Sequence, residues 1–179
     1  MEITINEEKL QNKEINEFSI KARAILINEN NQILIANYGN VILLPGGKVD
    51  KGESIFDAIT RELNEELGQD YNSDELEFFT TINYYQKNYP KRDGTFQNRL
   101  VLTHYFIGKL KEIKINLQKL TQKEQKDNFK LELISLEELE DKILNNKNNN
   151  PRNIYFQKEL LVVLDNYKNI KQNIIKKIK

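Results

Sequence analysis

The stretch GGKVDKGESIFDAITRELNEELGQ, residues Gly46–Gln69, decides how this chain is expected to fold. Ser54 is a favourable helix N-cap and Gly68 a favourable residue just past a helix C-terminus, so a helix is predicted over 54–67. At about 100° per residue its apolar side chains share one arc about 120° wide: Ile55, Phe56, Ile59, Leu63 and Leu67. One face of this helix is therefore expected to pack against a sheet.

Three glutamates occupy the adjoining arc of the same helix. Glu62, Glu65 and Glu66 are spaced i, i+3 and i+4, so their carboxylates crowd one turn and repel each other. Arg61 is the one positive charge beside them. A divalent cation would remove the repulsion, and Mg²⁺ or Mn²⁺ prefers such oxygen ligands. With one histidine and no cysteine in the chain, a metal site has to be built mainly from carboxylates.

The same stretch resembles the Nudix box, G-x5-E-x7-R-E-U-x-E-E-x-G-U, where U is a bulky apolar residue. The matching residues are Gly47, Glu53, Arg61, Glu62, Leu63, Glu65, Glu66 and Gly68. The final position departs from the pattern because it is Gln69, a change expected to affect packing at the helix exit more than chemistry. The resemblance implies a fold of the α+β class, a Nudix-like α/β/α sandwich with a mixed central sheet.

The resemblance also implies that one Nudix domain spans 1–179. Residues 1–18 are expected to form an N-terminal extension, and residues 168–179 a basic C-terminal tail. Family members often form dimers, so a homodimer is an open expectation.

The resemblance implies metal-binding roles for four residues. Glu62, Glu65 and Glu66 would be Mg²⁺ ligands, with Glu62 and Glu66 as the inner-sphere pair. The backbone carbonyl of Gly47 would be a further ligand, and glycine would let the chain approach the ion closely. The bound cation would bridge diphosphate oxygens, activate a water molecule and stabilise the developing charge.

The catalytic roles of other carboxylates are less sharply defined by the resemblance. Glu53 would be an additional ligand or would orient water, and Arg61 would hold Glu53 or another carboxylate in place. The general base would be a box glutamate or a carboxylate from a later loop. Glu124 is a candidate because its loop precedes a predicted strand, although an ordinary exposed position explains it more simply.

Candidate substrate contacts follow the box. Tyr84 and Tyr85 end a predicted strand and offer rings for stacking a base, although packing within the sheet explains them at least as well. Arg99, with the basic residues of the preceding loop, offers charge for distal phosphates. His104 alternates within LVLTHYFIG and is expected to be a hydrogen-bonded strand residue rather than a ligand.

The rest of the chain predicts further strands and helices around the box. In the strand predicted over 20–28, Ala22 and Leu26 fall on one face while Ile25 and Ile27 fall on the other. Other strands are predicted over 33–36, 41–44, 76–85, 100–107 and 129–134. Helices are predicted from Ser135 and over 152–169, and residues 86–98 are expected to form a loop around Asp93-Gly94.

The balance of charged residues limits the kinds of molecule that this protein is expected to bind. Lys+Arg and Asp+Glu both total 27, which argues against non-specific binding to nucleic acid or to anionic membranes. The N-terminus lacks the apolar core of a secretory signal, and no apolar run is long enough for a membrane span. The expected partner is a small nucleotide-like molecule, and the expected compartment is the cytoplasm.

The resemblance implies a Mg²⁺-dependent hydrolase, with Mn²⁺ as a possible substitute, that cleaves a diphosphate linkage. The substrate would be a nucleoside diphosphate linked to another group: a dinucleoside polyphosphate, a nucleotide sugar, ADP-ribose or a nucleoside triphosphate. A catalytically idle Nudix module that senses a nucleotide is the alternative, although such modules tend to lose box glutamates. An isomerase of allylic diphosphates would normally need a cysteine, which this chain lacks.

Overall fold

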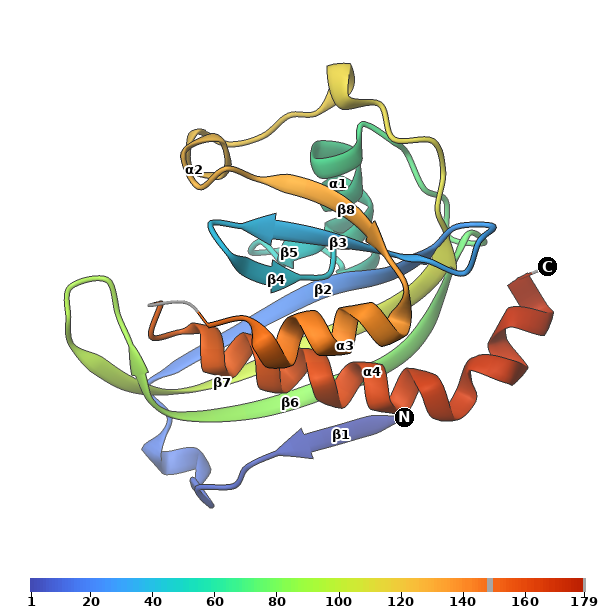
Figure 1. Ribbon diagram of the computed structural model, residues 1–179. Helices are drawn as coiled ribbons and strands as arrows, with labels where there is room; N and C mark the ends of the chain where they lie inside the picture. The colour runs from blue at the N-terminus through green and yellow to red at the C-terminus, as the bar shows by residue number, and fades with distance from the viewer. Residues whose placement is uncertain (148–149, 179) are drawn as a thin grey trace.

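Eight strands form one mixed sheet within the residues that the structure describes, and helices cover both of its faces (Figure 1). The computed structural model describes residues 1–147 and 150–178. The sheet has the order β1-β6-β7-β2-β3-β4, with β5 paired to β2 and β8 paired to β3. The strands are β1 (Glu2–Ile5), β2 (Glu17–Ile27), β3 (Ile33–Tyr38), β4 (Val41–Leu43), β5 (Gly46–Lys48), β6 (Leu76–Pro90), β7 (Phe96–Lys109) and β8 (Lys130–Ile134).

β2 runs through the middle of the sheet and separates two hydrophobic cores. It pairs in parallel with β7 along its whole length and antiparallel with β5 at the box. The alternation predicted for this strand is confirmed. Ala22 and Leu26 belong to the core under α1 (Ile55–Leu67), whereas Ile25 and Ile27 belong to the core on the opposite face.

The helices form a layer on each face of the sheet, which confirms the α/β/α sandwich. α1 contributes four fully buried residues to its core, Ala58, Ile59, Leu63 and Leu67. On the other face α3 (Leu136–Asn145) packs beside α4 (Asn153–Ile178), as Figure 1 shows. α3 opens with the predicted capping box, in which Ser135 and Glu138 each bond the backbone N–H of the other.

The predicted ends of the box helix are also confirmed. Ser54 Oγ accepts a hydrogen bond from the Asp57 backbone at 3.0 Å, and Gly68 adopts the left-handed conformation with φ 67°. A Cβ on Gly68 would lie 2.5 Å from the Lys114 carbonyl oxygen, so the segment after β7 packs directly on this glycine. Gln69 is buried, and its side-chain amide donates to the carbonyl of Glu112. A hydrogen bond thus replaces the apolar contact that the box pattern has at this position.

The loop predicted over 86–98 is wrong, because the two flanking strands continue into it. β6 extends to Pro90 and β7 begins at Phe96, which leaves Asp93 and Gly94 in the turn. The side chains of this arm are largely polar, so they give no alternating apolar signal. An antiparallel ladder is held by backbone hydrogen bonds and tolerates such residues on exposed faces.

Several short elements had no sequence signal. β1 pairs in parallel with β6 opposite Thr81–Tyr84, and the helix α2 (Gln122–Lys126) precedes β8. α4 continues to Ile178, beyond its predicted end and through the expected basic tail, of which Lys179 lies outside the described residues. Among the helices described, none is long and apolar enough to cross a membrane.

Candidate active site

A buried arginine fastens the loop between β4 and α1 to β2. The Arg23 guanidinium donates to the carbonyl oxygens of Leu44 and Gly46, the latter at 3.0 Å. Gly46 has φ 121° and lies so close to β2 that an added Cβ would overlap the Ala22 carbonyl oxygen. Glycine is therefore required at this position, and the loop is held against the strand.

The carboxylate of Glu62 packs directly against Gly47. A Cβ on Gly47 would lie 2.5 Å from Cδ of Glu62, so this side chain packs against the bare Cα. Burial raises the pKa of Glu62, and its bond to the Arg61 guanidinium opposes that rise. The fold therefore brings together one glycine and one glutamate that lie fifteen positions apart in the box.

Arg61 binds three carboxylates at once. Its Nε and Nη2 hold Glu53 at 2.8 and 3.0 Å. Its Nη1 reaches Glu62 at 2.9 Å and Glu65 at 3.3 Å. The two bonds to Glu53 lower the pKa of that carboxyl group. Arg61 thus acts as a clamp between the loop and α1, in agreement with the expectation that it holds Glu53.

Glu66 is the most buried of the box glutamates, with 1% of its surface exposed. The Tyr38 hydroxyl, at the end of β3, donates to one carboxylate oxygen, and the Gly46 backbone N–H donates to the other at 2.9 Å. Burial raises the pKa of Glu66 to about 8, and these two hydrogen bonds oppose the rise. Burial and the nearby Glu66 charge also raise the pKa of Tyr38, so the phenol remains a neutral donor.

The oxygen atoms of this turn fit a hard cation such as Mg²⁺ or Mn²⁺. Glu62 and Glu66 meet neighbouring glycines of one loop and offer oxygen ligands alone. Within the described chain, no group of three acidic or histidine side chains is gathered as tightly as a metal site requires. Instead, the Arg61 guanidinium provides the positive charge beside Glu62 and Glu65.

Three residues predicted to contact substrate, Tyr84, Tyr85 and Arg99, lie on the neighbouring strands β6 and β7, where Arg99 pairs with Gln86. Tyr84 is buried in the core under α4, which favours the packing explanation. The Tyr85 hydroxyl donates to Asn12 at 3.0 Å. Arg99 is buried near the hairpin arm, where its guanidinium carbon lies 3.2 Å from the centroid of the Tyr89 ring.

Glu124 lies nearer to the box than those three residues. Its carboxylate accepts from the Thr121 backbone N–H at 2.6 Å, so it caps α2, and its charge contributes to the raised pKa of Tyr38. His104 bonds Thr81 through Nδ1 at 3.0 Å, and burial lowers its pKa. His104 is thus the hydrogen-bonded strand residue that its alternation predicted.

A buried polar region, of which the sequence predicted only Arg99, lies between the first turns of α4 and strands β2 and β7. Its members are Lys21, Arg23, Arg99, Thr103, Tyr105 and Glu159. The Tyr105 hydroxyl donates to Glu159 at 2.8 Å, and burial lowers the pKa of Lys21 to about 8. The signal for it was Lys21 and Arg23 recurring within an otherwise apolar strand.

Two atoms of this polar region have unmet hydrogen-bonding capacity. Arg99 Nη2 and Thr103 Oγ1 are buried and have no partner among the described residues. Buried polar atoms are nearly always hydrogen-bonded, and a bound ligand is one reason for an exception. The region is contiguous with the box through Arg23, which also holds the Gly46 loop.

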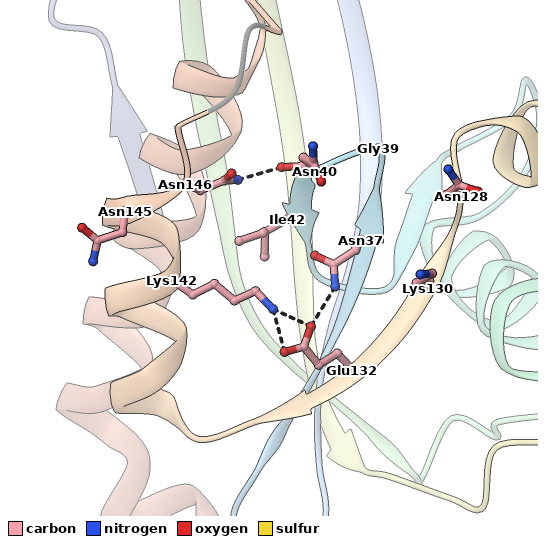
Figure 2. A pocket seen from close by; sticks show the side chains of 10 residues that line it. All are labelled: Asn37, Gly39, Asn40, Ile42, Asn128, Lys130, Glu132, Lys142, Asn145 and Asn146. Atoms are coloured by element: carbon pink, nitrogen blue, oxygen red, sulfur yellow. Dashed lines mark hydrogen bonds and ion pairs between the residues drawn. The ribbon is translucent and has the colours of Figure 1, made fainter.

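A separate cavity of about 630 Å³ lies on the reverse side of the β3–β4 hairpin (Figure 2). Figure 2 shows Lys142 and Asn37 converging on Glu132, and the amide of Asn37 donates to that carboxylate at 3.1 Å. Asn146 donates to the carbonyl of Asn40 at 2.7 Å. No box glutamate is among the described residues that line this cavity. The hydrogen bonds of its lining residues hold the hairpin to β8 and to the end of α3.

The model of the NUDIX domain family matches residues 18–157. The chain belongs to the Nudix family. The match begins within β2, includes the complete Nudix box and ends in the second turn of α4. It therefore contains the box and most of the polar region under α4.

Two bacterial relatives share a shorter stretch with this Nudix protein. The 8-oxo-dGTP diphosphatase of Escherichia coli (strain K12) is 43% identical over 53 residues, which cover 26% of this chain and 41% of the relative. The putative 8-oxo-dGTP diphosphatase of Bacillus subtilis (strain 168) is 49% identical over 49 residues, which cover 26% of this chain and 33% of the relative. The chain thus spans less than half the length of these curated relatives.

A solved structure confirms the fold over a larger part of the chain. The MutT protein from Methanosarcina mazei Go1 superposes with a TM-score of 0.52 at 18% sequence identity. The superposition covers 87% of this chain and 94% of that protein. At this level of identity the likeness concerns the fold alone.

Gly47→Ala is expected to displace the Glu62 carboxylate without unfolding the protein, because the added Cβ meets the flexible end of a side chain. Affinity for Mn²⁺, measured by titration calorimetry, should fall about tenfold or more because a ligand loses its orientation. Gly52→Ala is the control, since Gly52 has φ 85° but open space around Cβ. That control should lose about 1 kcal/mol of unfolding free energy and keep its Mn²⁺ affinity. An equal affinity loss in both variants would contradict the specific role of Gly47.

Proposed function

We propose that the protein is a Mg²⁺-dependent pyrophosphohydrolase, able to use Mn²⁺, that cleaves a diphosphate linkage in a nucleotide. The observation that carries this proposal is the seating of Glu62 against Gly47 and of Glu66 against Gly46. These two contacts place the carboxylates of Glu62 and Glu66 beside the backbone of the glycine loop. The Nudix box of this chain also has all of its glutamates.

The metal-binding role falls to four residues. Glu62 and Glu66 would be inner-sphere ligands, and Glu65 and the Gly47 carbonyl would complete the protein's share. When bound, Mg²⁺ would neutralise charge on the diphosphate and lower the pKa of a coordinated water. Of the three glutamates, Glu65 is tied to the protein most loosely, by a single 3.3 Å contact with Arg61.

Two arginines keep this constellation in place. Arg61 holds Glu53 through two bonds and steadies Glu62 from the same guanidinium. Arg23 keeps the carbonyl of Gly46 against β2 and so fixes the loop that bears Gly47. Both guanidinium groups are engaged within the protein, so we assign them to positioning rather than to contact with the scissile phosphates.

The general base is best assigned to Glu124. Glu53 is a poorer base, because two bonds from Arg61 lower its pKa. Glu124 lies close enough to Tyr38 for its charge to affect the phenol, and Tyr38 in turn bonds Glu66. To act as the base, this carboxylate would have to give up its bond to the Thr121 backbone N–H.

The polar region under α4 is the proposed site for the part of the substrate beyond the scissile linkage. The first turns of α4 would have to move away to admit it, because the free space beside Lys21, Arg23 and Glu159 is about 10 Å³. Lys21, Arg23 and Arg99 outnumber the neighbouring Glu17 and Glu159, and Arg99 Nη2 lacks an acceptor among the described residues. A phosphorylated group would supply charge and acceptors that the protein itself does not. A nucleoside triphosphate meets this need better than a nucleotide sugar, and the relatives named as 8-oxo-dGTP diphosphatases support the same class.

A substrate screen with Mg²⁺ tests this function. Nucleoside triphosphates including 8-oxo-dGTP, dinucleoside polyphosphates, ADP-ribose and nucleotide sugars would be assayed for released phosphate or nucleoside monophosphate. We expect one class to be turned over, and Glu66→Gln or Glu65→Gln to lower kcat about 100-fold or more with the fold retained. Glu29→Gln, on a side chain 83% exposed, should retain full activity.

Two results of the screen would count against the proposal. Near-normal turnover by Glu66→Gln or Glu65→Gln would remove the box glutamates from catalysis. Binding of a nucleotide without turnover of any compound would favour the nucleotide-sensing alternative instead.

Arg99→Met tests the proposed substrate region separately from the metal site. With the compound that the screen identifies, KM should rise about tenfold while kcat changes less than about twofold, because a phosphate contact is lost away from the reacting atoms. Lys109→Met is the matched control, since Lys109 lies at the other end of the same strand with 60% of its side chain exposed, and it should keep the wild-type KM. A wild-type KM for Arg99→Met would place the substrate elsewhere.

A further inference from the structure

Tyr38 stands outside the Nudix box, yet its hydroxyl donates to Glu66, the most buried of the box glutamates. It is the last residue of β3, twenty-eight positions before Glu66 in the chain. No motif connects the two residues, and only the packing of the β3–β4 hairpin against α1 brings them together. The contact is therefore specific to the folded chain.

The orientation of Glu66 depends on its hydrogen bonds. The terminal torsion of a glutamate is soft, so packing alone fixes its carboxylate plane poorly. Two donors fix it here: the Gly46 N–H, at 2.9 Å from one oxygen, and the Tyr38 hydroxyl on the other. Each carboxylate oxygen can accept a second partner, so both hydrogen bonds are compatible with metal coordination.

Tyr38 is itself rigidly mounted. Its backbone pairs with Val41 across the hairpin, and its ring packs edge-on against Phe129 with 5.0 Å between centroids. On the reverse side, Asn37 bonds Glu132 of β8, and the Asn40 carbonyl accepts from α3, as Figure 2 shows. The phenol is thus supported from both sides of the hairpin.

The same ring lies between α1 and the segment that carries Glu124. Phe129 follows that segment directly, and a Cβ on Gly39 would lie 3.5 Å from the Asp127 carbonyl oxygen. Tyr38 therefore contacts both a proposed metal ligand and the support of the proposed base. The Tyr38 side chain therefore links the position of Glu66 to that of the segment that carries Glu124.

We propose that Tyr38 is a positioning residue that holds the Glu66 carboxylate in the orientation needed for metal binding. The inference rests on the proposed function of the box. Removal of the hydroxyl leaves Gly46 N–H as the single donor to Glu66, and the carboxylate then samples orientations in which it no longer faces the cation.

Tyr38→Phe tests the proposal because it keeps the ring and its contact with Phe129. Titration of the resting protein with Mn²⁺ should show affinity weakened about fivefold or more, as expected when support for a metal ligand is lost. With the substrate from the screen, kcat should fall about tenfold or more while KM stays within about twofold, since a hydrogen bond to a charged group is lost. Thermal unfolding monitored by circular dichroism would show whether the variant is folded.

Tyr71→Phe is the matched control. The Tyr71 hydroxyl also makes partly buried hydrogen bonds, to the Lys109 carbonyl and from the Lys111 N–H, but it lies past the C-terminal end of α1 and its hydrogen bonds involve none of the box glutamates. This control should keep wild-type kcat and Mn²⁺ affinity whatever its loss of stability.

The possible outcomes separate the two claims. Wild-type kcat and Mn²⁺ affinity in Tyr38→Phe, with or without lower thermal stability, would overturn the positioning role. If Glu66→Gln still abolishes turnover in that case, the proposed function stands and only the inference fails. If Glu66→Gln is fully active, the proposed function fails first and the role of Tyr38 fails with it.

Discussion

The close approach of one turn of α1 to two bare glycines is the contact on which the rest of the site depends. Glu66 reaches the backbone N–H of Gly46, and Glu62 packs on the Cα of Gly47. A side chain at either glycine would meet β2 or a carboxylate, so the spacing between helix and sheet depends on their absence. Arg23 completes this arrangement by binding the loop from the strand below. The crowded carboxylates are balanced by the Arg61 guanidinium.

The helix α4 covers an apolar core with one part of its length and a polar region with another. Its later turns present Val163, Leu164 and Tyr167 to the apolar core, all of them nearly or fully buried. Its first turns instead cover the polar region that includes Arg99 and Glu159. Burial of apolar surface by the later turns contributes stability, and this offsets the cost of the unmatched polar atoms beneath the first turns. The polar end also lies next to the box.

Local sequence patterns predicted the parts of the fold that local chemistry determines. Ser54 and Gly68 defined the ends of the box helix, and the alternation through Ile25 assigned the two faces of β2. The hairpin arm was missed because its pairing rests on backbone bonds between polar residues, as where Gln86 pairs with Arg99. Tyr84 shows the opposite problem, since an aromatic residue after the box has the same sequence signal whether it stacks on a base or fills a core.

The site was predictable to the extent that it lies within one continuous motif. Glu62, Glu65 and Glu66 share a helical turn, so their proximity follows from spacing alone. Tyr38 and Arg23 come from different strands, and their place at the box depends on register and on long-range packing. No pattern within the chain reports such contacts, so these two residues emerged only from the folded structure.

We propose that the glutamate turn and the glycine loop together bind a divalent cation. Anomalous diffraction at the manganese edge, from crystals of the wild-type protein soaked in Mn²⁺, would locate this cation. We expect a peak within about 2.5 Å of carboxylate oxygens of Glu62 and Glu66, with Arg61 still bound to Glu53. A crystal of active protein with saturating Mn²⁺ and no anomalous peak between these two glutamates would contradict it.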